Sequence, residues 1–226
     1  MHFIQRWPAI AIAAIATVAL ALGGRASASE LDATALLSTA RVYHLRLHHL
    51  HTGESVDIVY RVGDMYIPMA LDQLNHFLRD HRTDAVSDYD PREFDLLNHL
   101  MTKLGRANGV IDIVCGYRSP WSNAFLRRGT SASGVAEHSQ HMEARAIDIR
   151  VPGVPTARLR DAALSLDAGG VGYYPKSQFV HVDVGPVREW SFGARRRHDQ
   201  AALRTARYAR HRHVHGRRSV IRQMGD

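Results

Sequence analysis

The sequence has a single cysteine, Cys115, among its 226 residues, so no disulfide can form within the chain. A chain without a disulfide must be stabilised by its hydrophobic core or by a bound metal ion. Most lone cysteines behave as buried, small apolar residues, and we predict this environment for Cys115. The alternative is a reactive thiol.

Long apolar runs are also scarce. The longest, Pro8 to Leu22, spans about fifteen residues, fewer than the roughly 20 that a membrane-spanning helix needs. Arg6 precedes it and the small residues Ala26-Ser27-Ala28 follow it, which is the layout of a secretory signal peptide. We therefore predict a signal peptide over residues 1–28, cleaved after Ala28, and a periplasmic protein. The alternative is an uncleaved membrane anchor.

An excess of charge is absent from most of the chain. The formal net charge is +7 and the sequence pI is about 10.0. Residues 193–226 contain ten Arg and two Asp, a net charge of +8, which leaves −1 for the rest. Because the basic character belongs to this tail, we expect no nucleic-acid partner. An anionic cell-wall polymer or a membrane surface is the predicted partner; the alternative is a solvated tail that binds nothing.

Between these terminal segments, short strands and short helices are mixed. A linker over residues 29–40 leads into a predicted domain over residues 41–192. We expect strands over residues 42–50, 56–62, 110–115, 144–151 and 180–184, and helices that begin near Pro68, Pro91, Pro120 and Thr156. Residues 129–137 are predicted to form a mobile loop, and Gly169-Gly170 is predicted to interrupt the regular secondary structure. This pattern indicates one α+β domain.

Two of the predicted strands carry potential metal ligands. Asp148 shares a strand face with Ala146, a small residue that leaves room for an ion, and His181 alternates with valines. His141 lies seven residues before Asp148, near enough to fold back over the same face. Two histidines and one carboxylate are a normal set for catalytic zinc, which keeps a fourth position for water. Zinc makes that water reactive near neutral pH, so we predict one Zn²⁺ per chain.

A resemblance to a known family strengthens this prediction. Residues Ser139 to Asp148 resemble the S-x-H-x-x-G-x-A-x-D motif of M15-type zinc peptidases, and Phe179 to Asp183 resemble their second ligand segment. Four further segments are similar to the murein endopeptidase K family: residues 49–54, 74–80, 116–119 and 168–175. The resemblance covers about residues 41 to 190.

The resemblance implies the fold, the substrate and the metal ligands. The expected fold is the LAS-type α+β domain, with a mixed, mainly antiparallel sheet flanked by helices. The expected substrate is the stem peptides of peptidoglycan. Characterised members cleave cross-links between two diaminopimelate residues, and related M15 enzymes act at D-Ala-D-Ala or L-Ala-D-Glu bonds. The ligands carried over are His141, Asp148 and His181.

Two departures from the family pattern bear on the site. The motif glycine is Ala144 here, so we expect a backbone that does without a positive φ at this position. Some relatives place a glutamate base three residues before the last ligand, but this position is Gln178, which cannot accept a proton. We predict Asp183 as the catalytic base instead; the alternative is that Asp183 orients His181. Glu137 and His138 are lesser candidates.

The remaining predicted site residues surround the metal position. Arg118, after a strand end, is predicted to contact either a developing oxyanion or a carboxylate of the substrate; the alternative is an exposed turn residue. The predicted substrate-binding residues are Tyr117, Asn123 and Ser139.

The sequence therefore predicts an exported, zinc-dependent peptidoglycan peptidase of the endopeptidase type. One alternative is a cell-wall-binding module that has lost catalysis but retains a zinc site. Another is a hydrolase with Cys115 as its nucleophile, which the apolar run from Val110 to Val114 opposes, since burial disfavours a thiolate.

Overall fold

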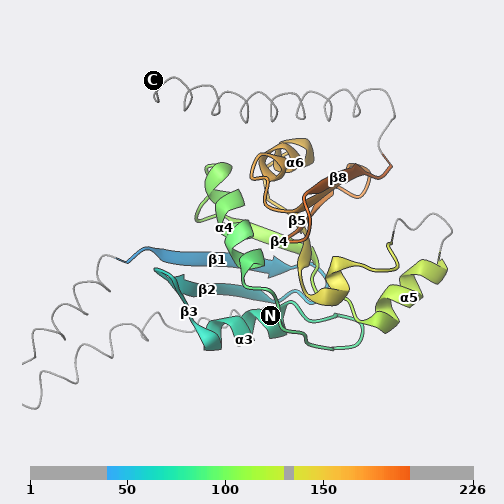
Figure 1. The fold of residues 1–226 in the computed structure, drawn as a ribbon, viewed down its shortest axis with the longest axis horizontal. Coiled ribbons are helices and arrows are strands. Elements are labelled where there is room, and N and C mark those ends of the chain that lie inside the picture. Colours follow the sequence, from blue (N-terminus) through green and yellow to red (C-terminus); the bar gives the residue numbers. More distant parts are fainter. Residues whose placement is uncertain (1–39, 130–134, 194–226) are drawn as a thin grey trace, which may run out of the picture.

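The computed structural model describes residues 40–129 and 135–193 (Figure 1). The predicted signal peptide and nearly all of the linker and basic tail lie outside these residues. The described elements are β1 (Val42–His49), β2 (Ser55–Val62), β3 (Met65–Tyr66), α3 (Pro68–Phe77), α4 (Arg92–Lys103), β4 (Val110–Cys115), α5 (Pro120–Gly129), the 3₁₀ helix η1 (Gln140–Glu143), β5 (Ala146–Arg150), α6 (Thr156–Leu164), β6 (Gly170–Tyr174), β7 (Phe179–Asp183) and β8 (Arg188–Ser191). None of the described helices is long and apolar enough to cross a membrane.

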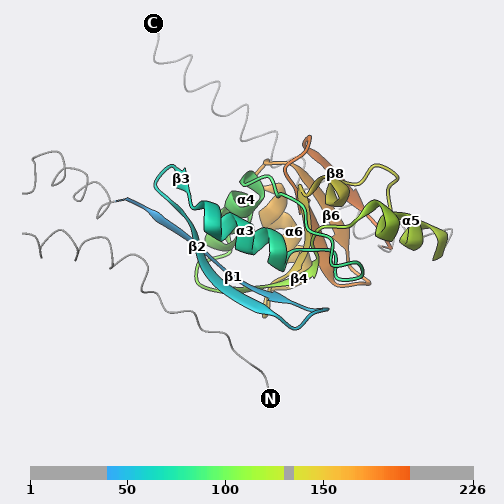
Figure 2. The same cartoon turned by 90° about the horizontal axis from the view of Figure 1, so that it is seen from below.

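All the described strands form one sheet in the order β3-β2-β1-β4-β5-β7-β6-β8. The pairs β1–β4 and β6–β8 are parallel, and the other neighbours are antiparallel. Helices α3, α4 and α6 lie over one face of the sheet, whereas α5 lies apart from them at the edge of the molecule (Figure 2). This architecture confirms the predicted α+β class and the mixed, mainly antiparallel sheet.

The core forms where the periodic apolar residues of sheet and helices meet. Leu45 and Leu47 alternate with polar residues along β1, so both point to the helical side and are buried. Phe94, Leu97 and Leu100 recur at the spacing of one helical face on α4 and are fully inaccessible. The five side chains belong to one hydrophobic cluster, which holds α4 against the sheet.

Strands β6 and β8 were not expected from the sequence. Gly169-Gly170 predicted a break, yet β6 begins at Gly170, and β8 follows what was predicted as the last strand. A Cβ atom at Gly170 would lie 2.3 Å from the carboxylate of Asp183, and one at Gly172 would lie 2.6 Å from the ring of Trp190. These glycines therefore mark close packing of other side chains against a strand. The predicted break is confirmed in the bend before β6, which includes Gly169, but the strand that begins at Gly170 was missed.

A buried carboxyl group stands out on α4. Glu93 has no exposed surface, and neither of its carboxylate oxygens has a hydrogen-bond partner among the described residues. Burial raises the pKa of Glu93 well above its usual value, and the negative charge of Asp183 acts in the same direction. Since the folded pKa exceeds the unfolded pKa, the free energy of unfolding is highest below the unfolded pKa. It falls as the pH rises through the folded pKa, where the buried carboxyl group loses its proton.

We predict that Glu93→Leu stabilises the protein at pH 8 by about 1–3 kcal/mol, the usual penalty for an unpaired buried polar group, and by less at pH 5. Glu93→Gln is the matched control, because it keeps the shape of the side chain but cannot titrate. Thermal unfolding between pH 5 and pH 8 measures the effect. An equal dependence of the Tm on pH in all three proteins would contradict this explanation.

Candidate metal centre

Two predicted ligands face each other across neighbouring strands. Asp148 on β5 and His181 on β7 are directly paired in the antiparallel register. Such pairs place their side chains on the same face of the sheet, with Cβ atoms about 4.5–5.5 Å apart. The Nδ1 atom of His181 lies 2.9 Å from Oδ1 of Asp148, and both side chains are buried. The strand register by itself thus brings together two residues that are 33 positions apart.

The third predicted ligand comes from the short helix η1. The Oγ atom of Ser139, at the N-terminus of η1, accepts a hydrogen bond of 3.4 Å from the backbone N–H of His141. The Nε2 atom of His141 lies 3.2 Å from Oδ1 of Asp148 and 3.1 Å from Nδ1 of His181. The structure therefore brings all three predicted ligands together at one point.

The chain turns from η1 into β5 at Ala144, the position of the motif glycine. Its φ and ψ are 50° and 46°, in the left-handed region, so the expectation of a backbone without positive φ is wrong. This conformation costs an L-residue roughly 1–2 kcal/mol. The carbonyl of Ala144 accepts a hydrogen bond of 3.1 Å from the backbone N–H of Asp90, and its methyl group is fully buried, which offsets part of that cost.

The protons on both imidazoles can be assigned from their outer hydrogen bonds. Nδ1 of His141 lies 2.8 Å from the carbonyl oxygen of Gly116, and Nε2 of His181 lies 3.0 Å from Oδ2 of Asp183. A carbonyl or carboxylate oxygen only accepts, so each of these ring nitrogens is a donor. In the neutral rings, the opposite nitrogens are then unprotonated. They face the carboxylate of Asp148, and three lone pairs meet within 3.2 Å.

Such a cluster of acceptors requires a cation between them. Burial alone would lower the pKa of His141, but the carboxylate of Asp148 outweighs it and raises this pKa to about 10. Burial alone would raise the pKa of Asp148, but the two histidines hold it below its usual value. A proton or a metal ion can therefore fill the position. Zinc bonds to nitrogen and oxygen of about 2.0–2.1 Å in a tetrahedral arrangement separate the ligand atoms by about 3.3 Å. The separations of 2.9, 3.1 and 3.2 Å between the three acceptor atoms are close to this value.

Cys115 lies beside this cluster. It pairs with Asp148 across β4 and β5, it is buried as predicted, and its sulfur lies within 4.8 Å of potential ligand atoms of His141 and Asp148, so these three residues are also a possible metal-binding group. This proximity was not predicted from the sequence, because it depends on the register of β4 against β5. The Nδ1 atom of His181 lies 3.1 Å from Nε2 of His141 and 2.9 Å from Oδ1 of Asp148, close to the separation of zinc ligands, so we take His181 as the third ligand.

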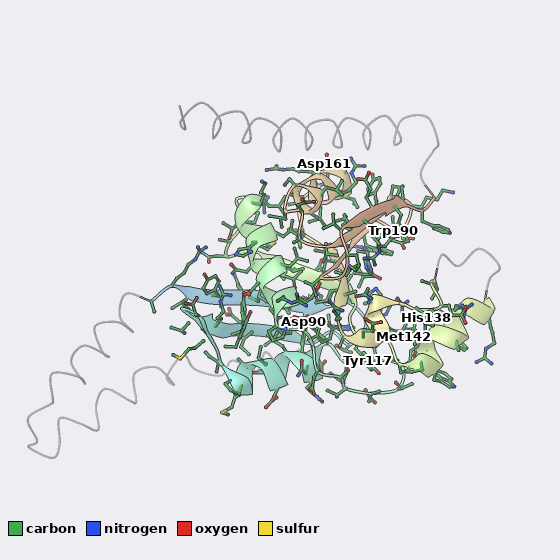
Figure 3. All side chains as sticks on the ribbon, viewed as in Figure 1. Asp90, Tyr117, His138, Met142, Asp161 and Trp190 are labelled. Atoms are coloured by element: carbon green, nitrogen blue, oxygen red, sulfur yellow. The ribbon has the colours of Figure 1, made fainter. Side chains whose placement is uncertain are left out.

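A cleft of about 480 Å³ opens above the three predicted ligands. Helix η1 and the segments before it and after β4 supply Arg118, Val135, Ala136, His138, Ser139 and Gln140. Strands β6, β7 and β8 supply Tyr174, Phe179, Arg188 and Trp190. Figure 3 labels His138 and Trp190, which come from these two groups. An open cleft over the predicted metal ligands would give a substrate access to a bound ion.

Arg118 has the position expected of a site residue. Its side chain lines the cleft and is only 8% exposed, so the alternative of an exposed turn residue does not hold. One guanidinium nitrogen lies 3.4 Å from Sγ of Cys115 and 3.9 Å from Oδ2 of Asp148. The backbone N–H donates to the carbonyl of His141 over 3.1 Å, which ties this loop to η1.

The three predicted substrate-binding residues differ in their positions. Ser139 lines the cleft. Asn123 is buried, accepts a hydrogen bond from Arg118, and donates to the carbonyls of Ala136 and Glu137. It therefore braces the loop and does not line the cleft. Tyr117 packs partly against the core and does not line the cleft either. These two predicted substrate contacts are not supported by the geometry.

Asp183 lies behind His181 and not in the cleft. Its side chain has no exposed surface, and its Oδ2 atom accepts from Nε2 of His181, on the ring edge away from Asp148. Burial alone would raise the pKa of Asp183, but the hydrogen bonds from His181 and Arg188 lower it below the usual value. This geometry opposes the predicted role of Asp183 as catalytic base and favours the alternative, that it orients His181.

Carboxylates suited to be the base are scarce in this cleft. Among the described residues that line it, Asp148 is the one carboxylate, and it belongs to the ligand cluster. Glu137 is exposed and pairs with Arg127 over 3.4 Å, whereas His138 lines the cleft. Gln178 is exposed at a turn and does not line the cleft. Of the two lesser candidates for the catalytic base, Glu137 and His138, His138 is therefore the one that can reach a substrate.

The sequence of this chain is similar to those of known proteins. The model of the family described as peptidoglycan L,D-endopeptidase MepK matches residues 37–190. The probable peptidoglycan L,D-endopeptidase MepK of Haemophilus influenzae is 43% identical over 141 residues, which are 62% of this chain and 75% of that protein. The peptidoglycan L,D-endopeptidase MepK of Escherichia coli K12 is 45% identical over 141 residues, 62% of this chain and 76% of that protein. No solved structure gave a significant match.

We predict that Asp183→Asn weakens zinc binding about 10–100-fold, the usual effect of removing a carboxylate that orients a metal-bound histidine. Competition with a chromophoric chelator measures the dissociation constant. Asp112→Asn is the matched control, because Asp112 also pairs with a histidine, His48, but on another part of the sheet. Loss of activity in Asp183→Asn with wild-type zinc affinity would restore the catalytic-base role.

Proposed function

Since the chain belongs to the peptidoglycan L,D-endopeptidase MepK family, we propose that it is an exported, zinc-dependent peptidase of peptidoglycan. Its reaction is the hydrolysis of a peptide bond in the stem peptides or their cross-links. The observation that carries this proposal is the convergence of His141, Asp148 and His181, whose three inward-facing acceptor atoms lie within 3.2 Å of one another.

These three residues would hold the zinc ion from one side, so that the cleft side stays open to the substrate. When bound, zinc supplies Lewis acidity and an activated water molecule for hydrolysis. The protein's own residues hold the reacting groups. Asp183 fixes the ring of His181, and the guanidinium of Arg118 faces the cleft, where it can stabilise negative charge on the substrate's carbonyl oxygen or bind a substrate carboxylate.

The chemistry of the cleft suits a stem peptide. Stem peptides carry free carboxylates, which complement Arg118, and aliphatic segments, which complement the aromatic wall of Tyr174, Phe179 and Trp190. The names of the relatives specify a bond between an L and a D residue, and we propose the same stereochemical class for this chain. Export by the predicted signal peptide would bring the enzyme to its substrate, and the basic tail would hold it to an anionic cell-wall polymer or membrane surface.

Digestion of purified peptidoglycan sacculi tests the proposal. We predict that the wild-type protein contains zinc and releases peptide fragments, which mass spectrometry identifies. His141→Ala should contain no zinc, and its rate of cleavage should fall by about 10³-fold or more, because one of the three ligands is gone. His48→Ala is the matched control: it removes a histidine that pairs with Asp112 away from the cleft, and it should leave zinc content and rate unchanged.

The outcomes separate the rival functions. Retention of the wild-type protein on sacculi without cleavage would favour a cell-wall-binding module. Cleavage that resists chelators but is blocked by thiol reagents would favour a hydrolase that uses Cys115. Full activity in His141→Ala would contradict the assignment of the metal site.

A further inference from the structure

The carboxylate of Asp183 is held by five hydrogen bonds. The backbone N–H groups of Gly170 and Gly185 donate to Oδ1 over 3.1 and 2.8 Å, and Nε2 of His181 donates to Oδ2 over 3.0 Å. Arg188 supplies the other two, from Nη1 to Oδ1 over 3.0 Å and from Nη2 to Oδ2 over 2.8 Å. This is a forked contact, in which both oxygens of the carboxylate are fixed by one planar group.

The backbone is shaped to admit this contact. A Cβ atom at Gly169 would lie 1.7 Å from the carbonyl oxygen of Asp183. One at Gly170 would lie 2.3 Å from the carboxylate of Asp183 and 2.6 Å from Nη1 of Arg188. A side chain at Gly169 would therefore collide with the backbone of Asp183, and one at Gly170 would displace the side-chain pair of Asp183 and Arg188. Gly170, the first residue of β6, is thus explained by the ion pair behind it, and Gly169 by the close approach of the Asp183 backbone.

The guanidinium of Arg188 is fixed from other directions as well. Nη1 also donates to the carbonyl of Pro186 over 3.0 Å, and the guanidinium carbon lies 5.1 Å from the centre of the Trp190 ring. The Trp190 ring is held in turn by a hydrogen bond of 2.9 Å from its Nε1 to the hydroxyl of Tyr174. Strand β8 therefore presents Arg188 to Asp183 in one orientation.

We propose that Arg188 is a positioning residue for the metal centre, which acts through Asp183 on His181. The fork fixes the plane of the Asp183 carboxylate. That carboxylate fixes the ring of His181 with its N–H outward, so that Nδ1 faces His141 and Asp148. This inference rests on the proposed function only in taking the three ligands as a zinc site. It adds a residue on a different strand that the sequence motifs did not single out.

Charge and shape both make this role specific to arginine. Asp183 has no exposed surface, and a buried carboxylate without a cation is strongly disfavoured. A lysine at position 188 could neutralise that charge, but a single ammonium group lacks the planar fork that fixes both oxygens. Arg188→Lys should therefore retain the fold more fully than it retains the orientation of His181.

Zinc affinity and steady-state kinetics of Arg188→Lys and Arg188→Ala test the proposal. We predict that Arg188→Lys folds and binds zinc about 10-fold more weakly, and that Arg188→Ala binds it 10–100-fold more weakly. At saturating zinc, kcat should fall while KM for a soluble stem peptide changes less than about twofold. The cobalt-substituted Arg188→Lys protein should also show a visible spectrum different from that of the wild type, because the ligand field depends on the orientation of His181.

Arg61→Ala is the matched control. Arg61 also pairs with an aspartate, Asp95, over 2.6 Å, and stacks on an aromatic ring, that of Tyr43. It lies on β2, near the opposite edge of the sheet, so its loss should lower the Tm and leave zinc affinity unchanged.

The proposal would be overturned by wild-type zinc affinity in folded Arg188→Lys and Arg188→Ala. A raised KM with unchanged zinc affinity would also overturn it, because it would make Arg188 a substrate contact. A wild-type protein that binds zinc but does not cleave sacculi would refute the proposed function and leave this inference standing, provided that the Arg188 variants lose zinc affinity. A wild-type protein that binds no zinc would refute both.

Discussion

The structure of the site depends on the mutual approach of three acceptor atoms: Nε2 of His141, Oδ1 of Asp148 and Nδ1 of His181. Three lone pairs within 3.2 Å repel one another unless a cation lies between them. The donors that could have relieved this repulsion are directed outward, to Gly116 and Asp183. The fold thus holds three acceptor atoms together although their electrostatic repulsion lowers its stability when no cation is bound, as is typical of a metal site.

Much of the surrounding architecture serves this approach. The antiparallel register of β5 and β7 sets Asp148 opposite His181, and the left-handed backbone of Ala144 turns η1 so that His141 reaches the same face. Behind His181, Asp183 occupies a space that exists because β6 has glycine where other strands have side chains. Each of these contacts helps to hold one acceptor atom within the narrow range of positions that metal coordination requires.

The fold class and the convergence of the three predicted ligands could be expected from the sequence because both depend on local patterns. Alternation along a strand determines the face on which Asp148 and His181 lie, and the spacing of His141 allows it to fold back over that face. Two expectations about the backbone were incomplete or wrong. The break predicted at Gly169-Gly170 is present in the bend before β6, but the same glycines also make room for Asp183 and Arg188. At the motif position, Ala144 was expected to avoid the conformation for which glycine is used, yet the tertiary contacts impose a φ of 50° on it.

The parts that could not be predicted depend on contacts between distant segments. Whether Asp183 faces the cleft or the back of His181 is decided by Arg188 on β8 and by the packing of β6, and neither strand was expected. Likewise, Cys115 was correctly predicted to be buried, but its position beside the ligand cluster depends on the pairing of β4 with β5. The alternation along a strand identifies which residues share a face, whereas their roles depend on contacts with residues from distant segments.

The proposed zinc ion lies between His141, Asp148 and His181. Anomalous diffraction at the zinc absorption edge, from crystals of the protein grown with zinc, would locate this ion. We expect one strong anomalous peak per chain, about 2.0–2.2 Å from each of the three acceptor atoms. The absence of a peak at this position, or a peak bound by Cys115 in place of His181, would contradict it.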